Sequence, residues 1–371
     1  MRIMLTHVDK IGRFKLRTND CAFIISCLDQ MCRGEENMDK KNITIADVAE
    51  ALNVSKTTVS RAISGKGRIS EATRVRVMNF IEEHDYRPNI IAKGLANSCT
   101  YNIGVVMPEN YGMSDATFFI DCLSGLHETA AASGYDILLT ICDNVDMSGL
   151  ERMVINHKVD GVVLMRTFIE DQAIRMLKER EVPFVVIGSS YDHEVIQIDT
   201  DNEGACKELT SILLMKQMRR IALIGGDADK VVSHKRLQGY LSAYEDAGIP
   251  VPKDMIYMNH ESPAAIYRAV EEIVRKGADC IACMDDNICI EVLNQLKKML
   301  VMIPKRMRVA SFFNSELLNK SIPSITAISF DVRKLGILGA ETLINIIEKK
   351  EYKAEQVLLP GYEVILKEST L

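Results

Sequence analysis

The stretch 42–97, which decides how the rest of the chain is interpreted, reads NITIADVAEALNVSKTTVSRAISGKGRISEATRVRVMNFIEEHDYRPNIIAKGLAN. Its apolar residues recur at helical spacing in three short segments separated by polar breaks. Two short helices joined by a tight turn make a helix-turn-helix, and a third helix closes a small apolar core. The spacing therefore predicts a three-helix unit. The alternative is an ordinary helical bundle, because helix-turn-helix patterns also arise by chance.

The three predicted helices span 44–52, 56–64 and 71–84. Each begins at a hydroxyl side chain that can accept a backbone amide as an N-cap, namely Thr44, Ser55 and Ser70. Asp47, three residues after Thr44, completes the pattern of a capping box. The residues predicted to face inward from the second and third helices are Val59, Ala62, Ile63, Val75, Met78, Phe80 and Ile81.

Charge is unevenly distributed along the chain. Residues 38–98 hold ten Lys and Arg against seven Asp and Glu, a net charge of +3, whereas 99–371 hold 29 against 39, a net charge of −10. A local basic excess is what contact with nucleic-acid phosphates requires. The net charge of the whole chain, −6, hides this difference.

The segments VAEALNVSKTTVSRAISGKGRISEATRVRV (48–77) and YRPNIIAKGLA (86–96) resemble the headpiece and hinge of the lactose/purine repressor (LacI/GalR) family. The resemblance implies that Lys56, Thr57 and Arg61 on the second helix reach base edges in the major groove of double-stranded DNA. It also implies that Ser55, Ser60, Ser70 and Thr73 hold phosphates. Lys and Arg donate to guanine, and Thr donates, accepts or touches a thymine methyl, so the chemistry suits these positions. The alternative for Lys56 and Thr57 is a solvated helix face.

Residues 88–98 follow the headpiece and are too few to form a stable isolated helix in water. The resemblance implies a hinge helix that orders when two copies pair on DNA, with Leu95 wedged into the minor groove and Asn89 and Ala92 beside it. An apolar wedge between base steps kinks the duplex, which gives this expectation a physical basis. The alternative is a plain linker. Residues 1–37 match nothing in the family and are interpreted as an upstream start or a disordered arm.

Composition narrows the class of protein. A chain of 371 residues is too long for one ordinary domain, and its hydrophobic content of 47% can fill the cores of two larger units. The ten cysteines are scattered, which favours reduced thiols and a cytoplasmic location. Cys280 and Cys283 form a CxxC pair in an apolar run, so buried strand thiols are preferred over a metal or redox site. No stretch approaches about 20 apolar residues, so no membrane contact is expected.

From Tyr101 onward, apolar β-rich runs alternate with helical stretches, which predicts parallel sheets covered by helices on both faces. The predicted strands are 102–107, 137–140, 161–165, 184–187, 221–224, 280–283 and 308–312. The predicted helices are 118–133, 170–181, 204–215, 235–247, 264–276 and 288–299. Two doubly wound subdomains follow from this count. The chain is expected to cross between them near 196–201 and 324–330, leaving a hinged cleft that binds a ligand at the carboxyl ends of the strands.

These observations predict a domain order in which the helix-turn-helix headpiece occupies 38–87, the hinge 88–98, and the effector-binding and dimerisation region 99–371. Within that region, the N-subdomain is expected at about 101–197 and 329–350, and the C-subdomain at about 198–325 and 351–371. Motifs such as DTDNEGA and RLQGYLSAYEDAGI resemble the same family, whose regulatory fold is like that of type I periplasmic binding proteins.

Four effector contacts are implied by that resemblance. Arg236 would clamp the effector with its planar guanidinium, Asp285 would contact it, and Phe118 and Phe119 would line the cleft mouth. The alternative for Arg236 is a surface salt bridge. Where the family commonly has a sugar-gripping acid, this chain has Phe313, so a simple sugar, a more apolar or aromatic metabolite, a phosphorylated species or no small ligand all remain open.

The sequence therefore predicts a transcriptional regulator, a repressor in the commonest case, controlled by a small-molecule effector. It is expected to act as a homodimer on a partly palindromic operator. Motifs typical of enzymes, such as GxxxxGK[ST], HExxH and GxSxG, do not occur, so neither catalysis nor a cofactor or metal is expected. The alternative is a regulator of the same fold that takes its signal from a protein partner.

Overall fold

The computed structural model describes residues 43–65, 67–86, 94, 99–108, 116–348, 357–359 and 361–371. The chain divides into two compact units, 1–93 and 94–371. The N-terminal extension 1–37 and the predicted hinge residues Asn89, Ala92 and Leu95 lie outside the described residues.

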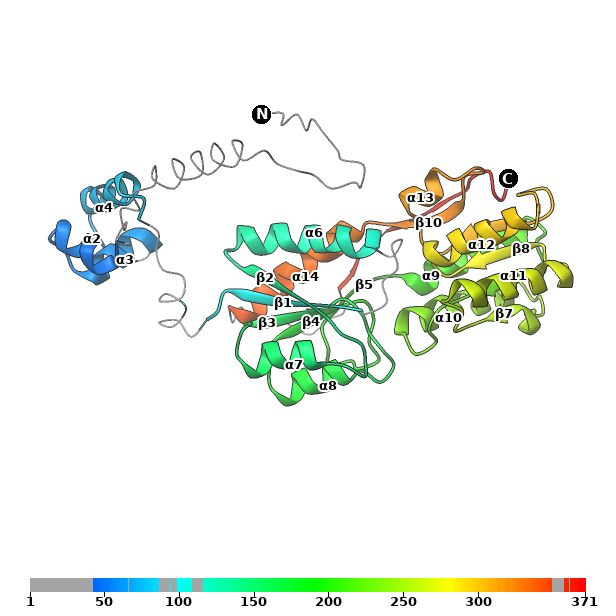
Figure 1. Ribbon diagram of the computed structural model, residues 1–371, viewed down its shortest axis with the longest axis horizontal. Helices are drawn as coiled ribbons and strands as arrows, with labels where there is room; N and C mark the ends of the chain where they lie inside the picture. Colours follow the sequence, from blue (N-terminus) through cyan, green and yellow to red (C-terminus); the bar gives the residue numbers. More distant parts are fainter. Residues whose placement is uncertain are drawn as a thin grey trace, which may run out of the picture. The chain divides into compact units, whose positions relative to one another are not determined.

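The described residues of the first unit, 43–65 and 67–86, form three helices, α2 (Ile45–Ala51), α3 (Lys56–Ser64) and α4 (Glu71–Glu83) (Figure 1). They confirm the predicted helices to within one residue, because side-chain caps define where each begins. Thr44 accepts the amide of Asp47 at 3.4 Å, and the Asp47 carboxylate accepts the amide of Thr44 at 2.7 Å, which completes the capping box. The centre of the core is formed by Val48, Val59 and Val77, which are fully buried.

The predicted inner face of α4 is confirmed for Phe80 and Ile81 and is wrong for Val75 and Met78. Val75 and Met78 are 48% and 45% exposed, whereas Val77 is fully buried and Phe80 and Ile81 pack against the core. Residues 77, 80 and 81 follow the 3, 4 spacing of a single helix face, and 75 and 78 lie on the neighbouring face. The apolar residues of α4 therefore outnumber the positions that the small core can cover.

In the N-subdomain, a six-stranded sheet has the order β11-β5-β4-β3-β1-β2, and every pairing is parallel. Its strands are β1 (Asn102–Met107), β2 (Asp136–Ile141), β3 (Gly161–Leu164), β4 (Phe184–Ile187), β5 (Gln197–Thr200) and β11 (Val357–Leu359). Alternate residues point to opposite faces, so Val163 packs with α6 (Ala116–Ala132) and α14 (Val332–Ile347), while Val162 packs with α7 (Ser148–Ile155) and α8 (Gln172–Glu179) (Figure 1). Helix α7 was not predicted.

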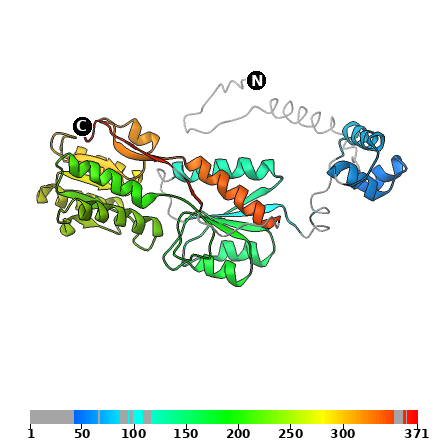
Figure 2. The same cartoon turned by 180° about the vertical axis from the view of Figure 1, so that it is seen from behind.

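Helices α6 and α14 come from opposite ends of the regulatory region and lie side by side on one face of this sheet (Figure 2). Their close approach depends on glycine. A Cβ at Gly336 would lie 1.9 Å from the carbonyl oxygen of Cys122, and a Cβ at Gly125 would lie 2.2 Å from that of Arg333. The two backbones therefore touch where side chains are missing.

In the C-subdomain, a six-stranded sheet has the order β12-β10-β9-β8-β6-β7 and is parallel except for the pairing of β10 with β12. Its strands are β6 (Ile221–Ile224), β7 (Ile256–Tyr257), β8 (Cys280–Cys283), β9 (Arg308–Ser311), β10 (Thr326–Phe330) and β12 (Tyr362–Ile365). Its helices are α9 (Asn202–Met215), α10 (Val231–Asp246), η1 (Lys253–Met255), α11 (Pro263–Lys276), α12 (Asp286–Lys298) and α13 (Glu316–Asn319).

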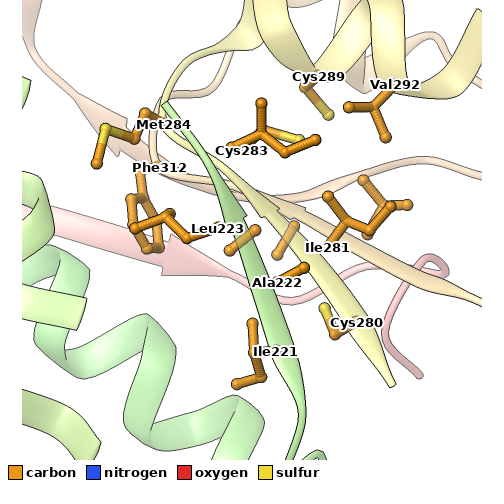
Figure 3. Close-up of a cluster of buried hydrophobic side chains, with 14 of the residues drawn as sticks. Ile221, Ala222, Leu223, Cys280, Ile281, Cys283, Met284, Cys289, Val292 and Phe312 are labelled. Carbon is orange, nitrogen blue, oxygen red and sulfur yellow. The ribbon is translucent and has the colours of Figure 1, made fainter. Parts of the chain in front are cut away.

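The CxxC pair lies inside this second core. Figure 3 shows Cys280, Cys283 and Cys289 among apolar side chains of β6, β8 and α12, and all three are fully buried. Burial raises the pKa of each of the thiols of Cys280 and Cys283 above its ordinary value, which keeps them protonated and unreactive. The expectation of buried strand thiols is confirmed.

The described strands and helices place three crossings between the subdomains, and two of these crossings were predicted. β5 still belongs to the first sheet, so the first crossing follows it. The third separates β11, which pairs with β5, from β12, which pairs with β10. Assigning all of 351–371 to the C-subdomain was therefore wrong, because a three-residue strand has no periodicity that reveals which distant edge it pairs with.

Candidate DNA interface and effector cleft

The outer surface of α3 presents the predicted base-reading side chains. Lys56, Thr57, Ser60 and Arg61 are all exposed, on a helix whose opposite face holds the buried Val59. The side chain of Arg61 packs closely against Gly67, where φ is +88°. A Cβ added at Gly67 would lie 3.0 Å from Cδ of Arg61. The aliphatic stem of Arg61 thus lies against a turn that favours glycine, and the residue remains exposed.

The other predicted phosphate contacts are involved in capping. The Ser55 hydroxyl accepts the amide of Thr58 at 3.1 Å, and the Ser70 hydroxyl accepts the amide of Thr73 at 3.2 Å. Ser70 Oγ and Thr73 Oγ1 are also 2.7 Å apart. These hydroxyls lie at helix N-termini, where free amides and the helix dipole favour an anion. A role in DNA contact for Ser55, Ser70 and Thr73 stays a prediction.

The four predicted effector residues, Phe118, Phe119, Arg236 and Asp285, all line one cavity of about 190 Å³ between the two subdomains. The cavity lies at the carboxyl ends of β3, β4, β6 and β8, the edge at which parallel α/β sheets hold ligands. The structure therefore brings these residues together. Their role in binding an effector stays a prediction.

Arg236 is held across the cleft floor by two neutral acceptors. Its Nε donates to Oδ1 of Asn202 at 3.1 Å, and its Nη1 donates to the carbonyl oxygen of Met284 at 2.5 Å. The surface salt bridge considered as an alternative is wrong, since no carboxylate pairs with Arg236 among the described residues. The guanidinium is thus fixed in position with its charge unpaired.

Three carboxyl groups line the cleft near Arg236, the buried Asp199 and Asp286 and the half-buried Asp285. Asp199 accepts from the Ser189 hydroxyl at 2.5 Å, and Oδ1 of Asp285 accepts the amide of Ile288 and so caps α12. Burial raises the pKa of both above its ordinary value, and the charge of Arg236 opposes that shift. Burial also raises the pKa of Asp286 to about 6. The neighbouring Ser315 hydroxyl opposes this shift of the Asp286 pKa, and Oδ2 of Asp286 has no accessible surface.

Arg166, which was not predicted, comes from the loop after β3 and also lines the cleft. It pairs with Asp171 at 3.2 Å and donates to the carbonyl oxygen of Asp143 at 2.8 Å. Its Nε is buried and has no partner among the described residues. The only signal in the sequence was a charged residue directly after an apolar strand.

Aromatic rings form a continuous wall of the same cleft. Phe118 lies 5.2 Å from Phe119 and 5.8 Å from Phe313, and Phe313 stacks on Phe330 at 6.3 Å. Phe313, which stands where a sugar-gripping acid was expected, is only 7% exposed. This aromatic wall, defined as Phe118, Phe119, Phe313 and Phe330, faces the same cavity as Arg236 and the carboxyl groups.

Hydrogen bonds join the two subdomains at the cleft mouth. An antiparallel bridge pairs Phe168 with Lys230, and the amide of Ile169 donates to the carbonyl oxygen of Asp229 at 2.8 Å. In addition, the hydroxyl of Tyr191 lies 2.6 Å from Nδ1 of His234. These contacts hold the loops after β3 and β4 against the start of α10.

The described residues contain no group of three or more His, Cys, Asp or Glu side chains arranged to hold a metal ion. None of their helices is both long enough and apolar enough to cross a membrane.

Comparison with known proteins shows which families the headpiece and the regulatory region are similar to. Residues 44–89 match the family model "Bacterial regulatory proteins, lacI family", and 210–370 match the "Periplasmic binding protein-like domain". The chain is 26% identical over 321 residues to catabolite control protein A of Staphylococcus xylosus, covering 86% of this chain and 96% of that one. It is 27% identical over 321 residues to the probable transcriptional repressor ExuR of Bacillus subtilis, covering 85% and 95%.

Among solved structures, the complex of the transcriptional regulator CelR with cellobiose superimposes with a TM-score of 0.68 at 25% identity, over 88% of this chain and 99% of that one. These names are those of regulators and not of enzymes, which confirms the prediction of a non-enzymatic protein. The fold prediction, a helix-turn-helix headpiece followed by two parallel-sheet subdomains, is also confirmed. Residues 44–89 therefore form a LacI-family DNA-binding domain, and residues 210–370 belong to a periplasmic-binding-protein-like domain.

Proposed function

We propose that the protein is a repressor whose affinity for a partly palindromic operator is controlled by a small molecule bound between the subdomains. The observation that supports this most is that one cavity collects Arg236, three carboxyl groups and the aromatic wall. A few polar groups that converge among apolar side chains in one cavity are typical of a ligand site. Relatives named as a repressor and as a sugar-bound regulator agree with this function.

Control requires a coupling free energy between the cleft and the headpiece. A ligand that contacts both subdomains favours one closure of the cleft, which changes how two copies meet and how their headpieces engage two half-sites. The protein would act in the cytoplasm as a homodimer, with Lys56, Thr57 and Arg61 reading bases and Ser60 on a phosphate.

Sequence-specific DNA binding is tested with the purified full chain. DNA duplexes that it binds are selected from random and genomic pools and sequenced. We expect one enriched sequence with approximate twofold symmetry. Titrating the protein on that sequence with candidate effectors should change its Kd by about tenfold or more, the usual size of a coupling of 1–3 kcal/mol. Enrichment without symmetry would contradict the dimer, and an unchanged Kd with a ligand bound would contradict effector control.

Leu95→Gly tests the proposed hinge wedge. The variant should weaken operator binding, because an apolar side chain that unstacks a base step is lost. Unfolding of the regulatory region should be unaffected. Equal operator affinity of variant and wild type in a gel-shift titration would exclude the wedge.

A second candidate is control by a protein partner. It is favoured by the hydrogen bonds of Phe168 and Ile169 to the segment before α10, which join the subdomains through protein atoms alone. A thermal-shift screen separates the two, because a ligand that binds the native state raises the melting temperature by mass action. No response to any small molecule, with operator binding restored by a cell extract fraction, would support this second function.

A further inference from the structure

We propose that the segment 297–308, called here the basic loop, binds the surface of a membrane that contains anionic lipids. It runs from the last turn of α12 to the start of β9. The basic loop therefore lies at the amino ends of the C-subdomain strands, whereas the effector cleft lies at their carboxyl ends. This inference goes beyond the proposed function and is independent of it. It comes from the juxtaposition of exposed cations and exposed aliphatic side chains on one loop.

The charge of this end of the subdomain differs from that of the rest. The basic loop reads KKMLVMIPKRMR and holds five Lys and Arg with no Asp or Glu. The segment 216–220, KQMRR, leads to the same place, because the amides of Arg219 and Arg220 donate to Oδ2 of Asp279 at 2.8 Å and the amide of Arg308 donates to the Asp279 carbonyl oxygen at 3.3 Å. Together the two segments hold eight of the 29 Lys and Arg of 99–371 and none of its 39 Asp and Glu. A basic surface thus stands out in an acidic region.

The fold accounts for only some of these cations. Lys297 and Lys298 lie in the last turn of α12, where the helix dipole favours positive charge, and Nζ of Lys298 lies 4.2 Å from the ring centre of Tyr267. Lys305 and Arg306 come after the turn and are both exposed. Neither forms an ion pair with any residue that the structure describes. Their charges are therefore available to an anion outside the protein.

Two aliphatic side chains of the basic loop are exposed to solvent. Leu300 is 88% exposed and Met302 is 62% exposed, whereas Val301 and Ile303 between and beside them pack against the core. Leu300 also has a φ of +56°, directly after the C-cap Met299, at the position that usually holds glycine. A left-handed leucine costs stability, and its exposed side chain gains little for the fold in return. A contact outside the subdomain is the gain that we infer.

An anionic membrane surface uses both features of the basic loop. Lys305 and Arg306 would meet lipid phosphates, while Leu300 and Met302 would enter the boundary between headgroups and acyl chains. A protein partner would favour aromatic anchors and few lysines, and DNA would leave the two aliphatic side chains in water. The expectation of no membrane contact considered only stretches long enough to span a bilayer, and a loop that binds its surface needs no such stretch.

The test is sedimentation of the purified full chain with vesicles, made either of phosphatidylcholine alone or of equal parts of phosphatidylcholine and phosphatidylglycerol. We expect the mixed vesicles to bind the protein about tenfold more strongly than the neutral ones, because each cation near an anionic surface adds to the attraction. Added salt should weaken the binding by screening these charges. The headpiece is basic too, so variants are needed to assign the binding to the basic loop.

Two variants remove the two features separately. Lys305→Gln combined with Arg306→Gln should weaken binding to the mixed vesicles by about 25-fold, or about fivefold for each cation. Leu300→Gly should weaken it by about threefold or more, because the inserted side chain is lost. The melting temperature of Leu300→Gly should stay the same or rise, since glycine suits the left-handed position. A role of Leu300 in the fold alone would instead lower the melting temperature and leave vesicle binding unchanged.

The controls carry similar changes in the N-subdomain. Arg175→Gln combined with Arg180→Gln removes two exposed cations at α8, and Val145→Gly removes an apolar side chain that is 93% exposed. Both controls should bind the mixed vesicles as the wild type does.

Three results would overturn the proposal: no binding to the mixed vesicles, equal binding to the two compositions, or equal losses from the control and the loop variants. A DNA duplex of random sequence provides the comparison with nucleic acid. If the Lys305 and Arg306 variant loses affinity for that duplex while the wild type binds no vesicles, the cations serve DNA and the membrane proposal is wrong. Operator affinity should be that of the wild type in both loop variants, so the outcome does not depend on the proposed function.

Discussion

The α3 surface and the effector cleft hold their polar side chains in opposite ways. On α3, Lys56, Thr57 and Arg61 are exposed and come from six consecutive residues. In the cleft, Asp199, Arg236 and Asp286 are mostly buried and come from β5, α10 and α12. One helix alone presents the side chains of the α3 surface, whereas the side chains of the cleft come together only when the two subdomains pack.

The difference teaches which changes each site tolerates. Exposed side chains on a capped helix can change without affecting the fold, because solvent replaces any lost contact. Buried polar groups depend on one another, since removing one leaves its partner desolvated and unpaired. Substitutions on α3 are therefore expected to act on DNA affinity alone, and substitutions in the cleft to act on stability and ligand response together.

The largest change in the free energy of unfolding is expected from a substitution in the core beneath the cleft. Phe312 is fully buried beside β8 and β6, so Phe312→Ala should destabilise the regulatory region by about 3–5 kcal/mol. Hydrogen exchange read by mass spectrometry should show faster exchange in β8 and unchanged exchange in α3. The control is Met302→Ala, at a side chain that is 62% exposed. Faster exchange in both regions would show that the two units are not independent.

Arg61→Ala tests the exposed surface. The lost contact should weaken operator binding by about tenfold to a hundredfold, or 1–3 kcal/mol, since Arg donates to base edges. The melting temperature should stay the same, because the Arg61 guanidinium is not part of the core. Met78→Ala on α4 is a matched exposed control and should leave the Kd unchanged. Equal losses from both variants would mean that α3 does not read DNA.

The ionisation of Asp286 links burial in the cleft to the pH dependence of stability. Its pKa is raised to about 6 in the folded protein, whereas an unfolded Asp has a pKa of about 3.9. Between these values the native state holds a proton that the unfolded state has released, so stability falls as the pH rises through this window.

Asp286→Asn removes the ionisable carboxyl group and with it the loss of stability at higher pH. It should be more stable than wild type by roughly 1–3 kcal/mol at pH 7.5, with the difference disappearing below about pH 4. Urea unfolding at a series of pH values measures this, with the exposed Asp136→Asn as control. A difference that does not depend on pH would show that Asp286 is not buried as a neutral acid.

The smallest change in free energy is expected from a substitution at the cleft mouth. Tyr191→Phe removes the hydrogen bond to His234 that joins the subdomains, at a tyrosine that is 44% exposed. The free-energy change should be about 0.5–1 kcal/mol, or twofold to fivefold in effector affinity. Tyr267→Phe is the matched control, because its hydroxyl donates to Glu291 within one subdomain. Equal shifts in both variants would exclude a role in closure.

Sequence reasoning succeeded where structure is local. The caps Thr44, Ser55 and Ser70 located α2, α3 and α4 to within one residue, because each cap acts on amides two or three residues away. It failed for Val75 and Met78, where the pattern is apolar but the core is too small to cover every apolar position. It also missed Arg166 and Asp286 in the cleft, since nothing near them in the sequence shows which side chains will face them.

The sequence by itself determined the three-helix headpiece and the alternation of strands and helices, because capping and periodicity act over a few residues. Only the tertiary structure decided that β11 and β12 end in different sheets and that Phe313 joins Phe118 and Phe330 in one wall. Pairing and burial depend on residues up to hundreds of positions apart. The set of side chains that lines the cleft is therefore a property of the folded chain.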